Sequence, residues 1–137
     1  LRSFTRPQKN ISVKNVVDKV AAYYGIDEES IYEKTRRREV VRPRQVIMYI
    51  LREDFSISYP TIGTKMGGRD HTTVIHSCEK IKREVIVDSE LAKEIQNIRT
   101  LLVWTSTLSY QQITLGMYVK IHNQFLLFFI YPHYQLY

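Results

Sequence analysis

The chain has 137 residues, which is enough for one domain with a hydrophobic core of its own. Lys and Arg number 20 against 14 Asp and Glu, and the net charge of +6 is consistent with a polyanionic partner. The single cysteine, Cys78, excludes an internal disulfide and a zinc site made of several cysteines. No uncharged apolar run is long enough to predict a transmembrane helix.

Composition divides the chain near residue 102. Residues 1–102 hold all 14 acidic residues and 19 of the 20 Lys and Arg, whereas residues 103–137 hold one Lys and nine of the 16 aromatic residues. We therefore predict a linker over residues 1–10, a folded domain over residues 11–102 and a separate aromatic tail over residues 103–137.

The first two predicted helices lie close together in the chain. Ser12 is a suitable N-cap for a helix that runs to about Tyr24, with valines at helical spacing on one face. Gly25 suits the left-handed position that ends a helix. A short helix over about residues 28–33 follows.

A basic loop and a third helix come next. Six of the eleven residues 34–44 are basic and one is acidic. Pro43 is favourable in the first turn of a helix, so we expect the loop to end there and the helix to run to about Asp54.

Three further helices complete the predicted domain. A short helix has Pro60 in its first turn and ends before the Gly67-Gly68 turn. Asp70 can cap the next helix, to about Val85, through a backbone N–H of the first turn. A last helix runs from residue 88 or 89 to about Leu102. The pattern predicts an all-α bundle of about six helices that contains a helix-turn-helix.

The chemistry of this pattern favours duplex DNA. In a helix-turn-helix that binds DNA, the N-terminus of the second helix enters the major groove, and here it carries polar side chains suited to base edges. An arginine from the basic loop can enter a narrow A·T-rich minor groove. Arg44 and Gln45 suit contacts with phosphate.

Three segments resemble the C-terminal DNA-binding domain of the bacterial replication initiator DnaA: RPRQ at 42–45, GGRDHTTVIH at 67–76 and CEKI at 78–81. The resemblance covers about residues 10–102 and implies a Trp-repressor-like helix-turn-helix that binds DnaA boxes at a replication origin, in the bacterial cytoplasm at the nucleoid. Site residues follow by match to the motif. Arg36 would enter the minor groove. Phosphates would be bound by Arg44, Gln45 and Lys80, with Arg52 near the DNA backbone. The residues that would face the major groove are Pro60, Asp70, His71, Thr72 and Thr73, with Arg69 beside them.

Other chemistries have weak support. Asp70 could serve as an N-cap alone, although the capping and base-reading roles are compatible. His71 and His76 are five residues apart and point in different directions on a helix, so we expect no shared metal ion. Consecutive Asp70, His71 and Thr72 do not converge as a catalytic triad must, and we predict no enzyme. Cys78 is expected in the core.

The family's ATPase domain has no counterpart in this sequence, because no P-loop motif occurs. We expect no cofactor here, since ATP belongs to that domain, and we expect oligomerisation through that domain alone. The alternative function is a non-specific nucleic-acid binder or a binder of an acidic phospholipid surface, driven by the basic loop and the apolar tail.

The tail over residues 103–137 has no counterpart in the family. Its β-branched and aromatic residues could form a hairpin, with Gly116 and Asn123 at turns. A packed extension, a membrane-surface anchor and a non-native read-through or frameshift product are the competing interpretations. We favour the last, because the composition changes abruptly where family members end.

Overall fold

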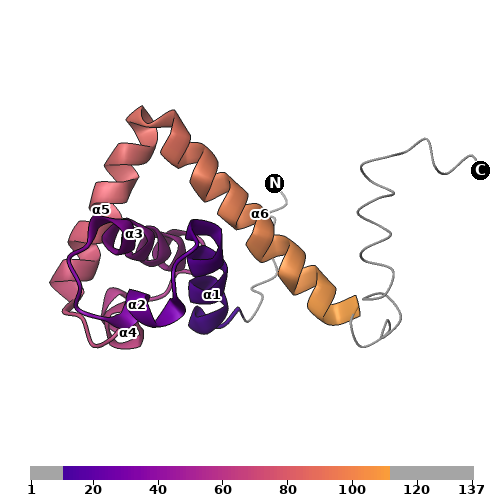
Figure 1. The fold of residues 1–137 in the computed structure, drawn as a ribbon, viewed down its shortest axis with the longest axis horizontal. Helices are drawn as coiled ribbons and strands as arrows, with labels where there is room; N and C mark the ends of the chain where they lie inside the picture. The colour runs from indigo at the N-terminus through magenta and orange to yellow at the C-terminus, as the bar shows by residue number, and fades with distance from the viewer. Residues whose placement is uncertain (1–10, 112–137) are drawn as a thin grey trace, which may run out of the picture. The chain divides into compact units, whose positions relative to one another are not determined.

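The computed structural model of the chain describes the backbone of residues 11–111 and the side chains as far as residue 103. This part of the chain forms six α-helices and no strand (Figure 1). They are α1 (Val13–Tyr24), α2 (Glu28–Tyr32), α3 (Arg38–Glu53), α4 (Tyr59–Lys65), α5 (His71–Val87) and α6 (Ser89–Gln111). The predicted all-α helix-turn-helix fold is thereby confirmed. The predicted linker lies outside the described residues.

The ends of α1 follow from local chemistry. The Ser12 side chain accepts a hydrogen bond from the backbone N–H of Asn15 at 3.2 Å. Gly25 adopts φ 65°, and its N–H donates to the carbonyl of Ala22. Both cap predictions are confirmed, because each depends on residues within one helical turn.

Helix α3 begins five residues earlier than the sequence predicted. Arg38 is its first residue, so Pro43 lies inside the helix and the basic loop is confined to residues 33–37. The physical reason is burial: Val40 is 2% exposed and extends the apolar face of α3 by one turn toward the N-terminus. That added burial outweighs the backbone hydrogen bond that an interior proline removes.

The core is built around α3. Helices α1 and α5 both pack against α3, and α4 packs against α5 (Figure 1). The described residues up to Leu102 form one compact unit. Each helix contributes buried apolar side chains, among them Val16, Val17 and Val20 of α1, Ile31 of α2, Val46, Ile47, Ile50 and Leu51 of α3, Ile62 of α4, Val74, Cys78 and Ile81 of α5, and Leu91, Ile95, Ile98 and Leu102 of α6.

Helix α6 is attached to the rest of this unit by polar contacts as well as by its apolar stripe. Arg99 donates two hydrogen bonds of 2.8 Å to the carboxylate of Asp54, and the Tyr24 hydroxyl lies 2.8 Å from Glu94. The carboxylate of Asp88 caps α6 by accepting from two backbone N–H groups.

The backbone of α6 continues to Gln111, beyond the predicted end at Leu102. The part of the possible hairpin that would include residues 104–111 is therefore wrong, because these residues are helical. The part of the tail prediction that concerns residues 112–137, with its proposed turns, lies outside the described residues. Among the helices described, none is both long and apolar enough to cross a membrane.

Candidate nucleic-acid interface

The turn between α4 and α5 is compact. Gly67 and Gly68 adopt φ 86° and 69°, as a glycine turn requires. The backbone N–H of Arg69 donates to the carbonyl of Gly63 at 2.7 Å. A Cβ atom on Gly63 would lie 2.2 Å from the Arg69 carbonyl oxygen, so only glycine permits α4 to approach the turn this closely. The predicted helix-turn-helix is confirmed, and Gly63 is a structural requirement that sequence inspection missed.

The N-terminus of α5 presents polar side chains to solvent. Asp70 occupies the N-cap position, yet its carboxylate makes no capping hydrogen bond and instead lies 3.1 Å from Nδ1 of His71. The expected capping bond from a backbone N–H of the first turn, that of Thr72 or Thr73, is therefore wrong. The Asp70 side chain is 64% exposed and that of His71 is 59% exposed, and both threonines are exposed as well. The N-terminus of α5 thus presents to solvent the carboxylate of Asp70, which is an acceptor, and the hydroxyl groups of Thr72 and Thr73.

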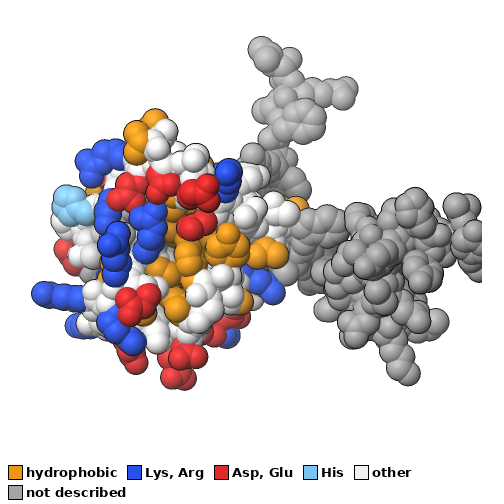
Figure 2. Space-filling model, turned by 45° about the horizontal axis from the view of Figure 1, so that its top comes forward, with side chains coloured by type: hydrophobic (Ala, Val, Ile, Leu, Met, Phe, Trp, Pro, Cys, Tyr) orange, Lys and Arg blue, Asp and Glu red, His pale blue; other side chains and the backbone are white. Residues whose placement is uncertain are grey.

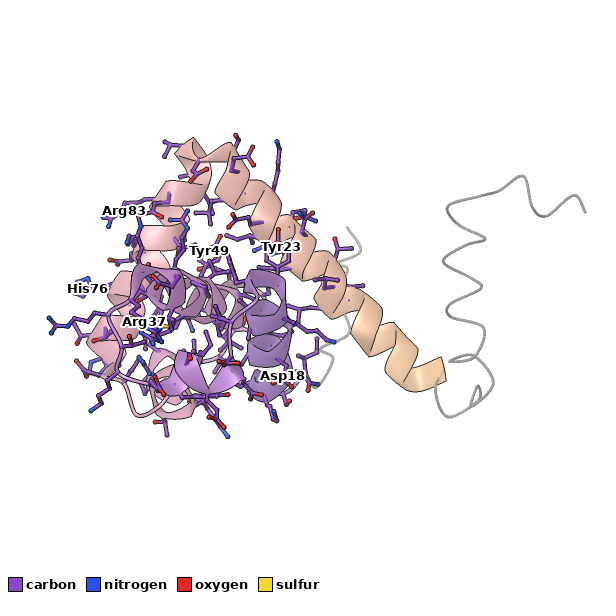
Figure 3. All side chains as sticks on the ribbon, in the orientation of Figure 1. Asp18, Tyr23, Arg37, Tyr49, His76 and Arg83 are labelled. Atoms are coloured by element: carbon purple, nitrogen blue, oxygen red, sulfur yellow. The ribbon has the colours of Figure 1, made fainter. Side chains whose placement is uncertain are left out.

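The basic loop over residues 33–37 exposes its cations. Arg36 and Arg37 are both exposed, and the Thr35 hydroxyl accepts from the backbone N–H of Arg37 at 3.3 Å. In Figure 3, Arg37 lies on the same side of the bundle as His76 and Arg83 of α5, while Asp18 and Tyr23 lie toward the other side. Lys and Arg side chains gather on the α5 side of the view in Figure 2.

Arg44 does not have the surface position that a phosphate contact implied. It is 7% exposed, and its guanidinium group points into the protein. Its nitrogens donate to four backbone carbonyls: Ile31 at 2.8 Å, Thr35 at 3.1 Å, Ser30 at 3.2 Å and Glu33 at 2.8 Å. Burial, together with the nearby charge of Arg69, lowers the pKa of Arg44 to about 10. The structure thus gives Arg44 a scaffold position, because four of its five N–H donors are used internally.

Arg69 is half-buried and contacts the same segment. Its guanidinium donates to the carbonyls of Tyr32 and Met66, and to the carbonyl of Glu33 at 2.7 Å. Burial lowers its pKa as well. The side chain of Arg69 is therefore directed at the loop, whereas its neighbour Asp70 is directed at solvent.

The other predicted site residues occupy the surface or its margin. Gln45 is half-buried on α3, and Pro60 is exposed in the first turn of α4. Arg52 donates to the carbonyl of Ile57 at 3.2 Å and stacks over the Tyr59 ring at 4.4 Å. Lys80 is 49% exposed and lies 3.9 Å from Glu84.

Arg42 was not predicted as part of this region. Its guanidinium pairs with Glu84 at 3.0 Å and with Asp88 at 3.3 Å, near the C-terminus of α5. No sequence signal links residues more than forty positions apart without a fold to bring them together.

Within the described chain, no group of three or more His, Cys, Asp or Glu residues is placed to hold a metal ion.

Comparison with known proteins gives this geometry a context. The family described as the bacterial dnaA protein helix-turn-helix matches residues 13–81, which is half of the chain. The chain belongs to this DnaA helix-turn-helix family. The matched region contains all eleven predicted site residues, the whole of α4, the turn and α5 as far as residue 81. It gives no reason to expect an enzymatic activity of these residues.

Several DnaA proteins are similar to the chain. The chromosomal replication initiator protein DnaA of Chloroflexus aggregans is 46% identical over 92 residues, which are 67% of this chain and 19% of that protein. DnaA of Roseiflexus castenholzii is 40% identical over 99 residues, 72% of this chain and 21% of that protein. DnaA of Herpetosiphon aurantiacus is 41% identical over 95 residues, which are 69% of this chain and 20% of that protein. The chain thus matches about a fifth of the length of these relatives.

Proposed function

We propose that residues 34–83 bind double-stranded DNA in a sequence-specific manner, at DnaA boxes of a replication origin. One observation carries the proposal: the exposed polar N-terminus of α5 and the exposed Arg36 belong to two segments that are hydrogen-bonded to each other through Arg69. Two such elements, held together, suit adjacent major and minor grooves of one duplex.

The side chains at the end of α5 have the chemistry of base readers. The Asp70 carboxylate can accept from cytosine N4, and each of Thr72 and Thr73 can use its hydroxyl group and, against thymine, its methyl group. The exposed N–H groups at the helix N-terminus favour a nearby phosphate. Arg36 supplies the cation for an A·T-rich minor groove.

Gln45, Arg52 and Lys80 are proposed to contact the sugar-phosphate backbone, with Pro60 packed at the major-groove edge. Contacts with phosphate set affinity and register without reading sequence. Arg44 is left out of this set, because its donors are used on carbonyls. We place its contribution to DNA binding in the loop that it supports.

The experiment is fluorescence anisotropy of the full chain with a DnaA-box duplex and a scrambled duplex of equal composition, each across a salt series. The proposal expects tighter binding of the DnaA box at every salt concentration. Equal affinity for the two duplexes would overturn it and favour the non-specific binder, for which the surplus of exposed Lys and Arg is the supporting observation.

Anionic phospholipid vesicles are the third arm of this experiment. We propose DNA as the main partner, so vesicles should not displace the DnaA-box duplex at physiological salt. We further propose a cytoplasmic location at the nucleoid. ATP binding and self-assembly are assigned to the family's ATPase domain and not to residues 11–111.

A further inference from the structure

Two guanidinium groups from different elements converge on the segment between α2 and α3. Arg44 reaches it from α3, and Arg69 reaches it from the turn before α5. Together they bind five backbone carbonyls between residues 30 and 35, and both donate to the carbonyl of Glu33, at 2.8 Å and 2.7 Å. We call Arg44, Arg69 and these carbonyls the arginine clamp.

The clamp provides hydrogen-bond donors for backbone carbonyls that have no partner within α2. Helix α2 has only five residues, so most of its carbonyls lack an N–H partner four residues later. Planar guanidinium groups with several donors can bind such carbonyls at once. Arg44 is buried and Arg69 is half-buried, so binding these carbonyls costs each guanidinium group part of its hydration.

A glycine contact reinforces the link between the segment and the turn. A Cβ atom on Gly67 would lie 2.6 Å from the carbonyl oxygen of Tyr32 and 2.9 Å from Nη1 of Arg69. The backbone of the turn therefore lies directly against the segment, with Arg69 beside that contact.

The position of the clamp in the chain is informative. On one side its last carbonyl belongs to Thr35, and the exposed Arg36 is the next residue. On the other side Arg69 immediately precedes the exposed Asp70, which opens α5. The clamp thus connects the residues directly adjacent to both proposed reading elements.

We infer that Arg44 and Arg69 are positioning residues that fix Arg36 relative to the N-terminus of α5, so that minor-groove reading depends on the clamp. This inference rests on the proposed function. It predicts that a loosened clamp impairs discrimination in the minor groove selectively, because the α5 side chains that face the major groove remain on an intact helix.

The test uses Arg69→Lys, which keeps the positive charge and removes the planar set of donors. Each A·T pair of the DnaA-box duplex is exchanged in turn for G·C or for inosine·cytosine. These two pairs match in the major groove, but only G·C places an amino group in the minor groove. Their affinity ratio therefore isolates minor-groove reading.

For the unaltered chain, the inosine duplex should bind more tightly than the G·C duplex by roughly tenfold at the pairs near Arg36. In Arg69→Lys this ratio should fall to within about twofold, whereas discrimination at major-groove positions persists. Arg99→Lys is the matched control, because Arg99 is also a half-buried, hydrogen-bonded arginine but lies outside residues 34–83, and its replacement should leave both ratios unchanged.

Three results would overturn the inference: an unchanged ratio, an equal loss of affinity for all duplexes, or a loss confined to major-groove positions. If Arg69→Lys fails to fold, as circular dichroism would show, Arg44→Lys provides the same comparison from the other half of the clamp. A wild-type chain without preference for the DnaA box over the scrambled duplex would refute the proposed function instead.

Discussion

At the scale of single residues, Arg44 shows that residue type does not decide exposure. An arginine in a basic stretch before a helix-turn-helix suggests a phosphate contact, yet this guanidinium lies inside the protein. A signal was present: Arg44 follows Val40 by four residues and precedes Ile47 by three, which places it on the buried face of α3. The exposed row Asp70–Thr73 could be predicted, because the apolar residues of α5 begin at Val74.

Replacement of Arg44 by Met should therefore lower stability before it alters DNA contacts. The change leaves the carbonyls of Ser30, Ile31 and Thr35 without a guanidinium partner, whereas Glu33 keeps its bond from Arg69. We therefore expect a loss of about 3 kcal/mol or more in the free energy of unfolding. Urea denaturation measures it. Arg38→Met is the control at an exposed site, where we expect a change of about 0.5 kcal/mol or less. Similar stability of the two variants would contradict the scaffold role.

The two kinds of proposed DNA contact should separate in mutants. Thr72→Ala and Thr73→Ala should each relax base discrimination by about 1–3 kcal/mol for a lost contact, because they remove groups that face base edges. Lys80→Ala should weaken cognate and scrambled duplexes alike and lower the salt slope by about one unit. Anisotropy titrations in two salts measure both effects. Equal losses on both duplexes for the threonine variants would refute their base-reading assignment.

Cys78 gives a pH-dependent contribution to stability. Burial is the main cause that raises the pKa of its thiol from 9.0 to about 11 in the folded chain. Between these values the unfolded chain binds fewer protons than the folded chain, so stability falls as pH rises. From pH 8 to pH 10 the loss should be about 1 kcal/mol. The variant Cys78→Ala lacks the titrating thiol, so its free energy of unfolding should fall by about 1 kcal/mol less between pH 8 and pH 10. If the stability of the unaltered chain and that of Cys78→Ala changed equally with pH, the Cys78 thiol would not be the cause.

At the scale of elements, local signals predicted helix ends where the cap lies within one turn. Ser12, Gly25 and the Gly67-Gly68 turn are examples, and the structure agrees with each. The start of α3 was mispredicted because Pro43 is favourable in a first turn, and that preference ignored the burial of Val40. Competition between a local preference and a tertiary contact can be resolved only once the partners of α3 are known.

The close approach of α4 to the turn is an element-level requirement that can be tested. Gly63→Ala would place a Cβ atom 2.2 Å from the Arg69 carbonyl, so α4 and the turn must move apart. We expect a loss of about 1–3 kcal/mol in stability, measured by denaturation. Thr64→Ala, at the next position and exposed, serves as the control for a change in helix composition. Equal stability of the two variants would mean that the turn adapts without cost.

At the scale of the whole molecule, sequence could predict an all-α fold that contains a helix-turn-helix, because apolar periodicity and the GGRDHTTV motif are local. It could not predict contacts between distant segments. The arginine clamp joins residues 30–35 to residue 69, and the pair of Asp54 with Arg99 joins the end of α3 to α6. Such pairs depend on the packed arrangement of the helices.

The pair of Asp54 with Arg99 should support stability without affecting sequence recognition. Asp54→Ala removes a doubly hydrogen-bonded ion pair whose arginine is one-third exposed, so we expect a loss of about 1–2 kcal/mol in the free energy of unfolding. Glu90→Ala, which removes an exposed pair with Lys93, should have no measurable effect. Because neither Asp54 nor Arg99 belongs to the proposed DNA-binding set, the ratio of DnaA-box to scrambled affinity should stay the same under conditions where both variants are folded. A change in that ratio for Asp54→Ala would show that the packing of α6 influences the interface.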